Sequence, residues 1–171
     1  MKGYVQVYTG DGKGKTTAAL GLALRAAGAG LKVLMAQFVK GMKYSEHVSL
    51  AKLSDAITVR QYGRRCFIKT DPEEADMKAA QEGLKEVKGL MSSGRYEVII
   101  LDEANIATSF GLFPVEELLD LIRAKPDEVE LVITGRMAAP QVIAEADLVT
   151  EMKEVKHYFQ KGVQARAGIE K

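Results

Sequence analysis

The residues best suited to chemistry lie close together near the start of the sequence, in a loop rich in glycine, lysine and threonine. In order, the loop reads Gly10, Asp11, Gly12, Lys13, Gly14, Lys15, Thr16 and Thr17. Glycines let a backbone approach phosphate oxygens closely and adopt positive φ. Backbone N–H groups that open a helix form a nest for an anion. The loop therefore predicts that the chain binds the phosphates of a nucleotide.

Two side-chain types in this loop indicate how the phosphates would be held. Lys15 would reach the terminal phosphates as a point charge, and Thr16 or Thr17 would offer a hydroxyl to Mg²⁺. The usual phosphate loop has glycine at the position of Thr9, whereas this chain carries it one residue later, at Gly10. The alternative is a glycine-rich turn with solvated lysines. An expected strand before the loop and an expected helix after it favour nucleotide binding.

Two carboxylates follow a second apolar segment. Residues 98–101 are apolar and are followed by Asp102 and Glu103. If this segment is a strand of a parallel sheet, both carboxylates lie at the edge where such folds bind ligands. There they could hold Mg²⁺ directly or through water. The alternative is an ordinary helix N-cap, for which Asp is favoured. The phosphate loop elsewhere in the chain favours the metal.

Further candidates are expected at the same edge of the sheet. Arg136 follows the apolar segment 130–135, and its planar guanidinium could bind a phosphate or another part of the nucleotide. On the residues alone, a turn with a surface arginine explains this position slightly better. Gln37 and Lys40 close another expected strand and could contact the ligand. His47 is expected on the surface of a helix.

Apolar segments that alternate with turn-forming ones predict the elements that position these residues. Strands are expected at 3–9, 31–38, 57–63, 97–104 and 130–135, and helices at 15–27, 45–53, 71–91, 114–124 and 139–146. Residues 3–38 thus read as a strand–helix–strand unit. The segment 147–152 receives no assignment. Strands that are apolar on both faces and alternate with helices predict a mostly parallel sheet with helices on both sides.

Length and charge restrict the possible functions. A chain of 171 residues is expected to form one domain. Its 24 Lys and Arg against 23 Asp and Glu leave a net charge of +1, which gives no electrostatic argument for a nucleic-acid or membrane partner. The single cysteine, Cys66, cannot form an internal disulfide and fits a reducing cytosol. With no targeting segment and no long apolar run, a cytoplasmic protein is expected.

Several segments together resemble the phosphate-loop class of ATP:corrinoid (cob(I)alamin) adenosyltransferases. The resemblance rests on YTGDGKGKTTAALGLALRAAGAGLKVLMAQFVKG, LDEAN, FPVEELL, TGR, ADLVTEM and VKHYFQKGVQARAGIE, in the same order over nearly the whole chain. The displaced glycine of the phosphate loop is this family's own form. The resemblance implies a single adenosyltransferase domain over 1–171. Its fold would be a three-layer α/β, P-loop NTPase-like (RecA-like) fold.

The resemblance also implies a reaction, in which ATP gives its 5′-deoxyadenosyl group to a reduced Co(I) corrinoid and tripolyphosphate leaves. It implies that Lys15 and Glu103 are catalytic, and that Thr16, Glu103 and Asp102 lie on the Mg²⁺ side. The nucleotide-binding residues would be Gly10, Asp11, Gly12, Lys13, Gly14, Lys15, Thr16, Thr17 and Arg136. A homodimer is implied, with a flavin-type reductase as the source of Co(I).

The chain departs from some family members at one place. Those members carry a Phe-x-Trp pair that shields the lower face of the corrin, whereas this chain has no Trp and reads GRRCFIK over 63–69. His157 lies in the family-like last segment and could help shape the site.

Two other functions remain open. A small-molecule kinase or ATPase would share the phosphate loop but transfer or release phosphate. A non-catalytic ATP sensor would bind ATP without turnover.

Overall fold

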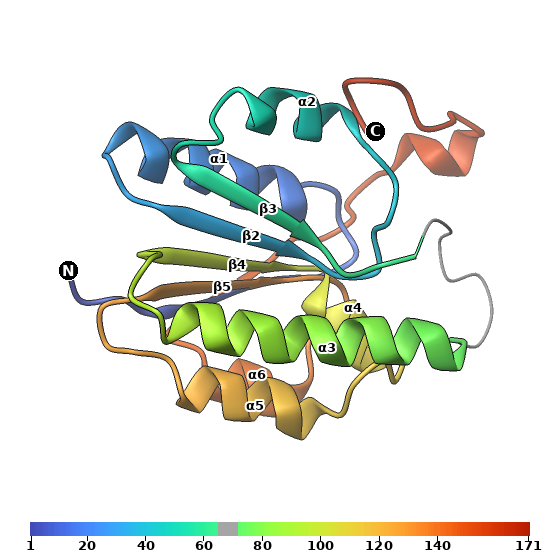
Figure 1. The fold of residues 1–171 in the computed structure, drawn as a ribbon. Coiled ribbons are helices and arrows are strands. Elements are labelled where there is room, and N and C mark those ends of the chain that lie inside the picture. The colour runs from blue at the N-terminus through green and yellow to red at the C-terminus, as the bar shows by residue number, and fades with distance from the viewer. Residues whose placement is uncertain (65–71) are drawn as a thin grey trace.

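Six strands are present in the computed structural model, which describes residues 1–64 and 72–171 (Figure 1). They are β1 (Val5–Thr9), β2 (Val33–Gln37), β3 (Ile57–Gln61), β4 (Val98–Asp102), β5 (Glu130–Thr134) and β6 (Leu148–Glu151). The strands form one sheet in the order β3-β2-β4-β5-β1-β6, and every neighbouring pair is parallel. All six therefore end at the same edge.

Helices cover both faces of this sheet, so the molecule has three layers (Figure 1). One face carries α1 (Lys15–Gly28) and α2 (Ser45–Ala51). The other face carries α3 (Glu74–Met91), α4 (Ala104–Ser109), α5 (Val115–Arg123) and α6 (Pro140–Glu145). The predicted α/β fold with a parallel sheet and helices on both sides is confirmed.

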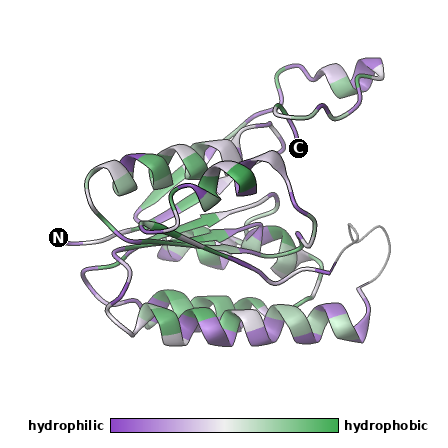
Figure 2. Cartoon of the chain, turned by 45° about the horizontal axis from the view of Figure 1, so that its top comes forward, coloured by the Kyte–Doolittle hydropathy of each residue, from purple (hydrophilic) through white to green (hydrophobic). Residues whose placement is uncertain are grey.

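Burial along the central strands explains why the sheet needs cover on both faces. Every residue of β2 and β4 is buried, and successive side chains of a strand point to opposite faces. On the α1 side, the core includes Ala19 and Ala23 of the helix and Met35 of β2. The two alanines are small, so the helix lies close to the sheet. On the other side, the rings of Phe38 and Phe113 meet with centroids 5.5 Å apart. Figure 2 shows the apolar sheet between its helices.

The order of the strands differs from their order along the chain. Although residues 3–38 form a strand–helix–strand unit, β1 and β2 are not neighbours, because β4 and β5 lie between them. This arrangement places β4, which is buried at all five positions, inside the sheet and away from its edges. The strands with exposed residues, β3 and β6, form the two edges.

Most elements end within a few residues of the prediction, and three differences bear on the site and the sheet. The strand expected at 97–104 ends at Asp102, because Glu103 adopts a left-handed conformation with φ 63° and α4 begins at the next residue. The helix expected from residue 71 begins at Glu74, with Glu73 as its N-cap. The unassigned segment 147–152 contains β6, which pairs with β1.

The last residues form a segment that returns to the phosphate loop. This C-terminal tail, residues 153–171, contains a short 3₁₀ helix over Tyr158–Lys161. Its last residues reach the loop before α1, where Lys13 Nζ donates to the Ile169 carbonyl at 3.1 Å. Of the helices in the described ranges, none combines the length and apolar character that crossing a membrane needs.

Candidate active site

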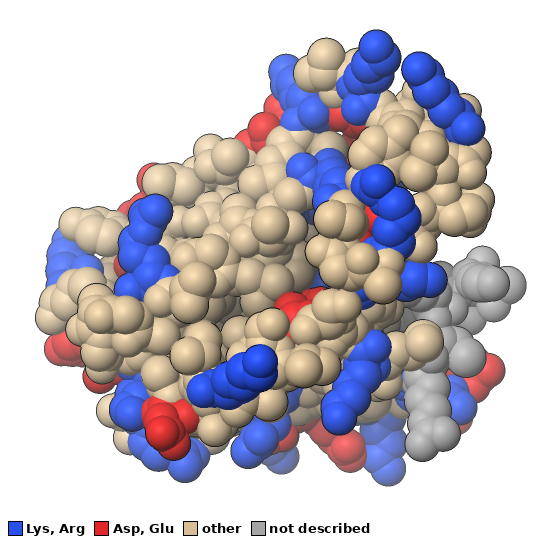
Figure 3. All heavy atoms as spheres, turned by 90° about the horizontal axis from the view of Figure 1, so that it is seen from above, with Lys and Arg blue, Asp and Glu red and all other residues tan. Residues whose placement is uncertain are grey.

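A cavity of about 850 Å³ lies at the carboxyl edge of the sheet. Its walls come from the phosphate loop, the segment after β2, α2, α4, the segment after β5 and the C-terminal tail. Of the predicted site residues, those that line it are Asp11, Gly12, Lys13, Gly14, Lys15, Thr16, Thr17, Glu103 and Arg136. Figure 3 shows Lys and Arg side chains projecting from the face that carries α2 and the tail.

Lys15 opens α1 and folds back over its own loop. Its Nζ donates to the carbonyls of Gly10 at 2.6 Å and Gly12 at 2.8 Å. Burial lowers the pKa of Lys15, an effect that the nearby Glu103 carboxylate partly offsets. The first turn of α1 carries no acidic side chain that would neutralise the positive end of the helix. The loop therefore offers an ammonium and a helix N-terminus to an anion.

Gly10 and Gly12 allow the segment that joins β6 to the tail to run against the phosphate loop. A Cβ at Gly10 would lie 2.5 Å from the Met152 carbonyl oxygen, and one at Gly12 would lie 2.7 Å from it. The N–H of Gly12 donates to that same oxygen at 2.7 Å. The sequence assigns the backbone N–H groups of Gly10 and Gly12 to the nucleotide. The Gly12 N–H already has an acceptor within the protein. Gly10 is not among the residues that line the cavity.

Replacing Gly12 with alanine should destabilise the fold and weaken nucleotide binding. The new methyl group would overlap Met152 and Lys153, and such overpacking lowers the free energy of unfolding by about 1–3 kcal/mol. Gly21→Ala is the matched control, because a Cβ at this mid-helix position would have no atom within 4 Å apart from its chain neighbours and the backbone of its own helix. That change should raise stability by about 0.5–1 kcal/mol. Urea unfolding measures both; equal stability of the two variants would contradict the role of the close contact.

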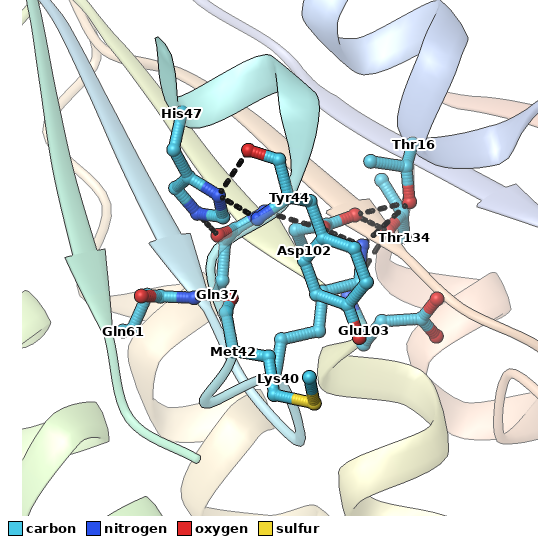
Figure 4. Close-up of polar contacts among 10 residues, drawn as sticks. All are labelled: Thr16, Gln37, Lys40, Met42, Tyr44, His47, Gln61, Asp102, Glu103 and Thr134. Atoms are coloured by element: carbon cyan, nitrogen blue, oxygen red, sulfur yellow. Dashed lines mark hydrogen bonds and ion pairs between the residues drawn. The ribbon is translucent and has the colours of Figure 1, made fainter. Parts of the chain in front are cut away.

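Asp102 accepts from four donors, which lie in α1, β2, β5 and the turn after β2 (Figure 4). Its Oδ1 accepts from Thr16 Oγ1 at 2.9 Å and from Thr134 Oγ1 at 2.8 Å. Its Oδ2 forms an ion pair with Lys40 Nζ at 2.8 Å and accepts from Gln37 Nε2 at 3.3 Å. The carboxylate is fully buried, and these four donors compensate its charge. Asp102 therefore connects the phosphate loop with the ends of β2 and β5.

Glu103 lies beside this network but is oriented differently. It is the N-cap residue of α4, yet its side chain makes no capping hydrogen bond. Figure 4 shows its carboxylate pointing away from Asp102, and the residue lines the cavity. Burial raises the pKa of Glu103, and the Asp102 carboxylate raises it further. The helix-cap alternative therefore does not account for either acidic side chain, and Glu103 is placed to meet a ligand.

Arg136 reaches the cavity from the segment after β5. The preceding Gly135 has φ 128°, and a Cβ there would lie 3.0 Å from the Ile106 nitrogen. This tight contact between the β5 end and α4 directs the chain toward the cavity that Arg136 lines. Its guanidinium acts electrostatically on both Lys15 and Glu103. The sequence alone slightly favoured an uninvolved surface arginine, whereas the structure brings it to the site.

The chain matches the model of a family described as ATP:corrinoid adenosyltransferase BtuR/CobO/CobP over residues 1–170. The chain belongs to the ATP:corrinoid adenosyltransferase family. A protein of Pseudomonas aeruginosa named corrinoid adenosyltransferase is 34% identical over 99% of this chain and 84% of its own length. One of the same name from Escherichia coli, and one named Corrinoid adenosyltransferase CobA from Salmonella typhimurium, are each 32% identical over 99% of this chain and 86% of theirs.

Membership of the adenosyltransferase family confirms the resemblance seen in the sequence, and with it the P-loop type of the α/β fold. The family's Phe-x-Trp pair corresponds to the segment 63–69 of this chain. The residues that come to its positions, Cys66 and Ile68, or Phe67 after a one-residue slip, lie outside the residues that the structure describes. Their part in shielding the corrin stays a prediction.

His47 lies in helix α2, as predicted, but its side chain is only half-exposed and makes contacts that the prediction did not include. Its Nδ1 accepts from the Tyr44 backbone N–H at 2.8 Å. This leaves Nε2 to donate to Gln37 Oε1 at 2.7 Å, so that the Gln37 amide nitrogen faces Asp102. Hydrophobic spacing in α2 gave no sign of this contact, because it depends on α2 lying over the end of β2.

The C-terminal tail contributes a wall of the cavity that was only partly expected. His157 lines the cavity, as its place in the family-like segment suggested, and so do Gly168, Ile169, Glu170 and Lys171. The tail is held by an ion pair between Lys13 and Glu170 at 3.7 Å and by the Ser45 hydroxyl, which donates to the Lys171 carbonyl at 2.9 Å. The family-like sequence of this segment was the signal that marked it.

Proposed function

We propose that this chain, acting as a single domain over 1–171, transfers the 5′-deoxyadenosyl group of ATP to the Co(I) centre of a reduced corrinoid. The observation that carries the proposal is the family match over residues 1–170, with the phosphate loop at one wall of a cavity large enough for a nucleotide. In this reaction the Co–C5′ bond forms with the electron pair of Co(I). The C5′–O bond breaks, and tripolyphosphate leaves with its electron pair.

The chain's own task is to hold the triphosphate and to stabilise the leaving group. Co(I) is itself a strong nucleophile, so no protein base is needed to activate it. Lys15 supplies a positive charge near the phosphates, and the N-terminus of α1 supplies backbone N–H groups. Arg136 adds a second cationic group to the cavity wall. Ile106 and Phe110 line the same cavity and offer an apolar surface to a flat ring, either the adenine or the corrin.

The donor set beside the phosphate loop fits Mg²⁺. Thr16, Asp102 and Glu103 provide a hydroxyl and two carboxylates, which are oxygen ligands of the kind that Mg²⁺ takes together with substrate phosphates. Bound there, Mg²⁺ would neutralise charge on the triphosphate. Thr16 Oγ1 lies 2.9 Å from Asp102 Oδ1. Lys40 Nζ lies 3.2 Å from Thr16 Oγ1 and 2.8 Å from Asp102 Oδ2, which supports a cation site beside these oxygens. We therefore propose that these three residues hold the metal.

Other features of the predicted enzyme belong to the same proposal. A homodimer, a flavin-type reductase that supplies Co(I), and a cytoplasmic location are consistent with membership of the family. The physiological acceptor would be cobalamin or an earlier corrinoid. Neither a nucleic acid nor a membrane is expected as a partner, since the net charge is +1.

The deciding experiment is anaerobic incubation of the protein with ATP, Mg²⁺ and chemically reduced cobalamin. Loss of the Co(I) absorbance, with photolabile adenosylcobalamin and tripolyphosphate as products, is the expected result. Release of orthophosphate would favour a kinase or ATPase instead. ATP binding without turnover of either kind would favour a nucleotide sensor. Either of these outcomes would overturn the proposal.

Glu103→Gln should weaken the dependence of the reaction on Mg²⁺. Loss of a carboxylate beside the metal is expected to raise the Mg²⁺ concentration for half-maximal activity by at least about ten-fold. Because the Glu103 pKa is raised above 4.5, acidification neutralises this carboxyl at a higher pH than an ordinary glutamate. Apparent Mg²⁺ affinity of the wild type should therefore fall as the pH drops through mildly acidic values, and this fall should be smaller in the variant.

The control for this prediction is Glu116→Gln, which changes an exposed glutamate of α5 on the opposite face of the sheet. Its Mg²⁺ titration should match that of the wild type at every pH. A Glu103→Gln protein with the same Mg²⁺ titration as the wild type would remove Glu103 from the metal site.

A further inference from the structure

Lys40 occupies the space between two of the residues proposed to hold Mg²⁺ (Figure 4). Its Nζ lies 2.8 Å from Asp102 Oδ2 and 3.2 Å from Thr16 Oγ1. The ammonium is thus bound by a carboxylate oxygen and a hydroxyl oxygen, the same two oxygen types that a magnesium ion would take there. The sequence suggested only that Lys40 could contact the ligand, and did not relate it to the metal.

The backbone around Lys40 is built to hold this residue in place. The preceding Val39 has φ 63°, a left-handed conformation that is exceptional for a β-branched residue. On the other side, a Cβ at Gly41 would lie 2.0 Å from the Arg64 carbonyl oxygen, so the segment packs directly on the backbone that follows β3. Gln61 Nε2 also donates to the Met42 carbonyl at 3.0 Å. A strained and closely packed turn therefore aims Lys40 at Asp102.

Backbone strain of this kind is concentrated at the site. In the described ranges, the residues other than glycine with positive φ are Val39, Glu103 and Met137. They follow β2, β4 and β5 respectively, all at the carboxyl edge of the sheet. Strained conformations that cluster in this way are typical of functional sites, where the surrounding structure maintains them. The turn at Val39 therefore belongs to the same site as Glu103.

Of the four donors to Asp102, Thr16 and Lys40 line the cavity, and Lys40 is the one with a long flexible side chain. Thr134 and Gln37 are completely buried, and Gln37 is held from behind by His47. Lys40, in contrast, lines the cavity, and its side chain is 13% exposed. Its four-carbon stem lets the ammonium swing while the backbone stays fixed. When Lys40 moves away, Gln37 and Thr134 keep the carboxylate oriented.

We propose that Lys40 is a tethered cation that takes the place of the metal in the nucleotide-free protein and moves onto the triphosphate when Mg²⁺–ATP binds. A divalent ion and an ammonium repel each other strongly when both lie against one buried carboxylate. Metal entry therefore expels the ammonium, and the cavity directs it toward the phosphates. The inference rests on the proposed function, since it takes Asp102 and Thr16 as metal-side residues.

The first test measures Mn²⁺ binding, as a substitute for Mg²⁺, to the protein without nucleotide or corrinoid. Electron paramagnetic resonance of free Mn²⁺ gives the affinity. Lys40→Met removes the competing charge but keeps the stem, and should bind Mn²⁺ at least about ten-fold more tightly than the wild type. Lys40→Arg keeps the charge and should show no such gain. Lys43→Met, at an exposed position in the same segment, should equal the wild type.

The second test uses the wild-type protein, so it does not depend on a variant that folds. Acetylation of lysines by an N-hydroxysuccinimide ester, followed by mass spectrometry, should modify Lys40 slowly in metal-free protein and several-fold faster once Mg²⁺ or Mn²⁺ is added. Lys43 should react at the same rate in both conditions. Unchanged Mn²⁺ affinity in Lys40→Met, or metal-independent labelling of Lys40, would overturn the proposal.

A third measurement follows the second half of the movement. Binding of tripolyphosphate in the presence of Mg²⁺, measured by calorimetry, should be about ten-fold weaker in Lys40→Met than in the wild type, because one ammonium contact is lost. Equal tripolyphosphate affinity in Lys40→Met and the wild type would overturn the proposed movement of Lys40 onto the phosphates. None of these readouts requires adenosylation, so failure to form adenosylcobalamin would refute the proposed function without altering the metal-binding result, and the reverse also holds.

Discussion

A Lys15→Ala protein should lose adenosylation and tripolyphosphate formation by about 10²–10³-fold. The Lys15 ammonium stands at the cavity wall, and it is the lysine that the phosphate loop itself holds, through the carbonyls of Gly10 and Gly12. Charge develops on the tripolyphosphate as the C5′–O bond breaks, so a fixed positive group acts mainly on the transition state. The loss should therefore be larger in kcat than in the KM for ATP.

The fold of this variant should be nearly unchanged. Removal of the two hydrogen bonds should lower the free energy of unfolding by about 1 kcal/mol, measured by urea titration. Lys13→Ala is the comparison, because Lys13 is exposed and engages the tail through Glu170. It should retain much more activity than Lys15→Ala. Tripolyphosphate production at the wild-type rate by Lys15→Ala would contradict the proposed role of the loop.

The second large effect is expected at Asp102. Asp102→Ala should lower the free energy of unfolding by about 3 kcal/mol, because it leaves the fully buried Thr134 hydroxyl and Gln37 amide without their acceptor. It also removes the acceptor of the Thr16 hydroxyl and the Lys40 ammonium. Activity should fall as well, since the proposed metal-side carboxylate is gone. Urea unfolding and the anaerobic assay measure the two effects separately.

Two comparisons separate the fold from the chemistry at this position. Asp102→Asn keeps the shape of the side chain and one carbonyl oxygen, so it should unfold at a higher urea concentration than Asp102→Ala while still losing activity. Asp55→Ala changes an exposed aspartate and should alter the free energy of unfolding by no more than about 0.5 kcal/mol. An Asp102→Ala protein as stable as Asp55→Ala would show that the hydrogen bonds and the ion pair of Asp102 together contribute nothing to the fold.

Sequence reasoning reached the parts of this protein whose physics is local. The loop from Gly10 to Thr17 could be identified because glycine, lysine and threonine at this spacing have few uses other than binding phosphate. Asp102 and Glu103 could be assigned to the ligand edge because the apolar run before them is short enough for a strand and its topology is parallel. Apart from α4 and β6, the helices and the strands of the sheet followed from apolar periodicity, within a few residues of their observed ends.

Sequence reasoning did not reach features that depend on contacts between distant segments. The order of the strands was not expected, since residues 3–38 say nothing of β4 and β5 lying between β1 and β2. The short helix α4 was missed, because its start depends on the left-handed backbone of Glu103, a residue that usually avoids it. The environment of His47 was misjudged for a similar reason, since its partner Gln37 lies on another element.

The sequence by itself therefore determined which chemistry this protein can carry out: its loop, its acidic pair and its order of motifs specify a phosphate-binding α/β adenosyltransferase. Only the tertiary structure decided how Asp102 is surrounded, with Thr16 from α1, Lys40 from the turn after β2 and Thr134 from β5. The physical reason is that a buried carboxylate must be compensated by whatever donors the packing of the sheet brings to it. The spacing of residues along the chain does not indicate which donors these are, because they lie far from Asp102 in the sequence.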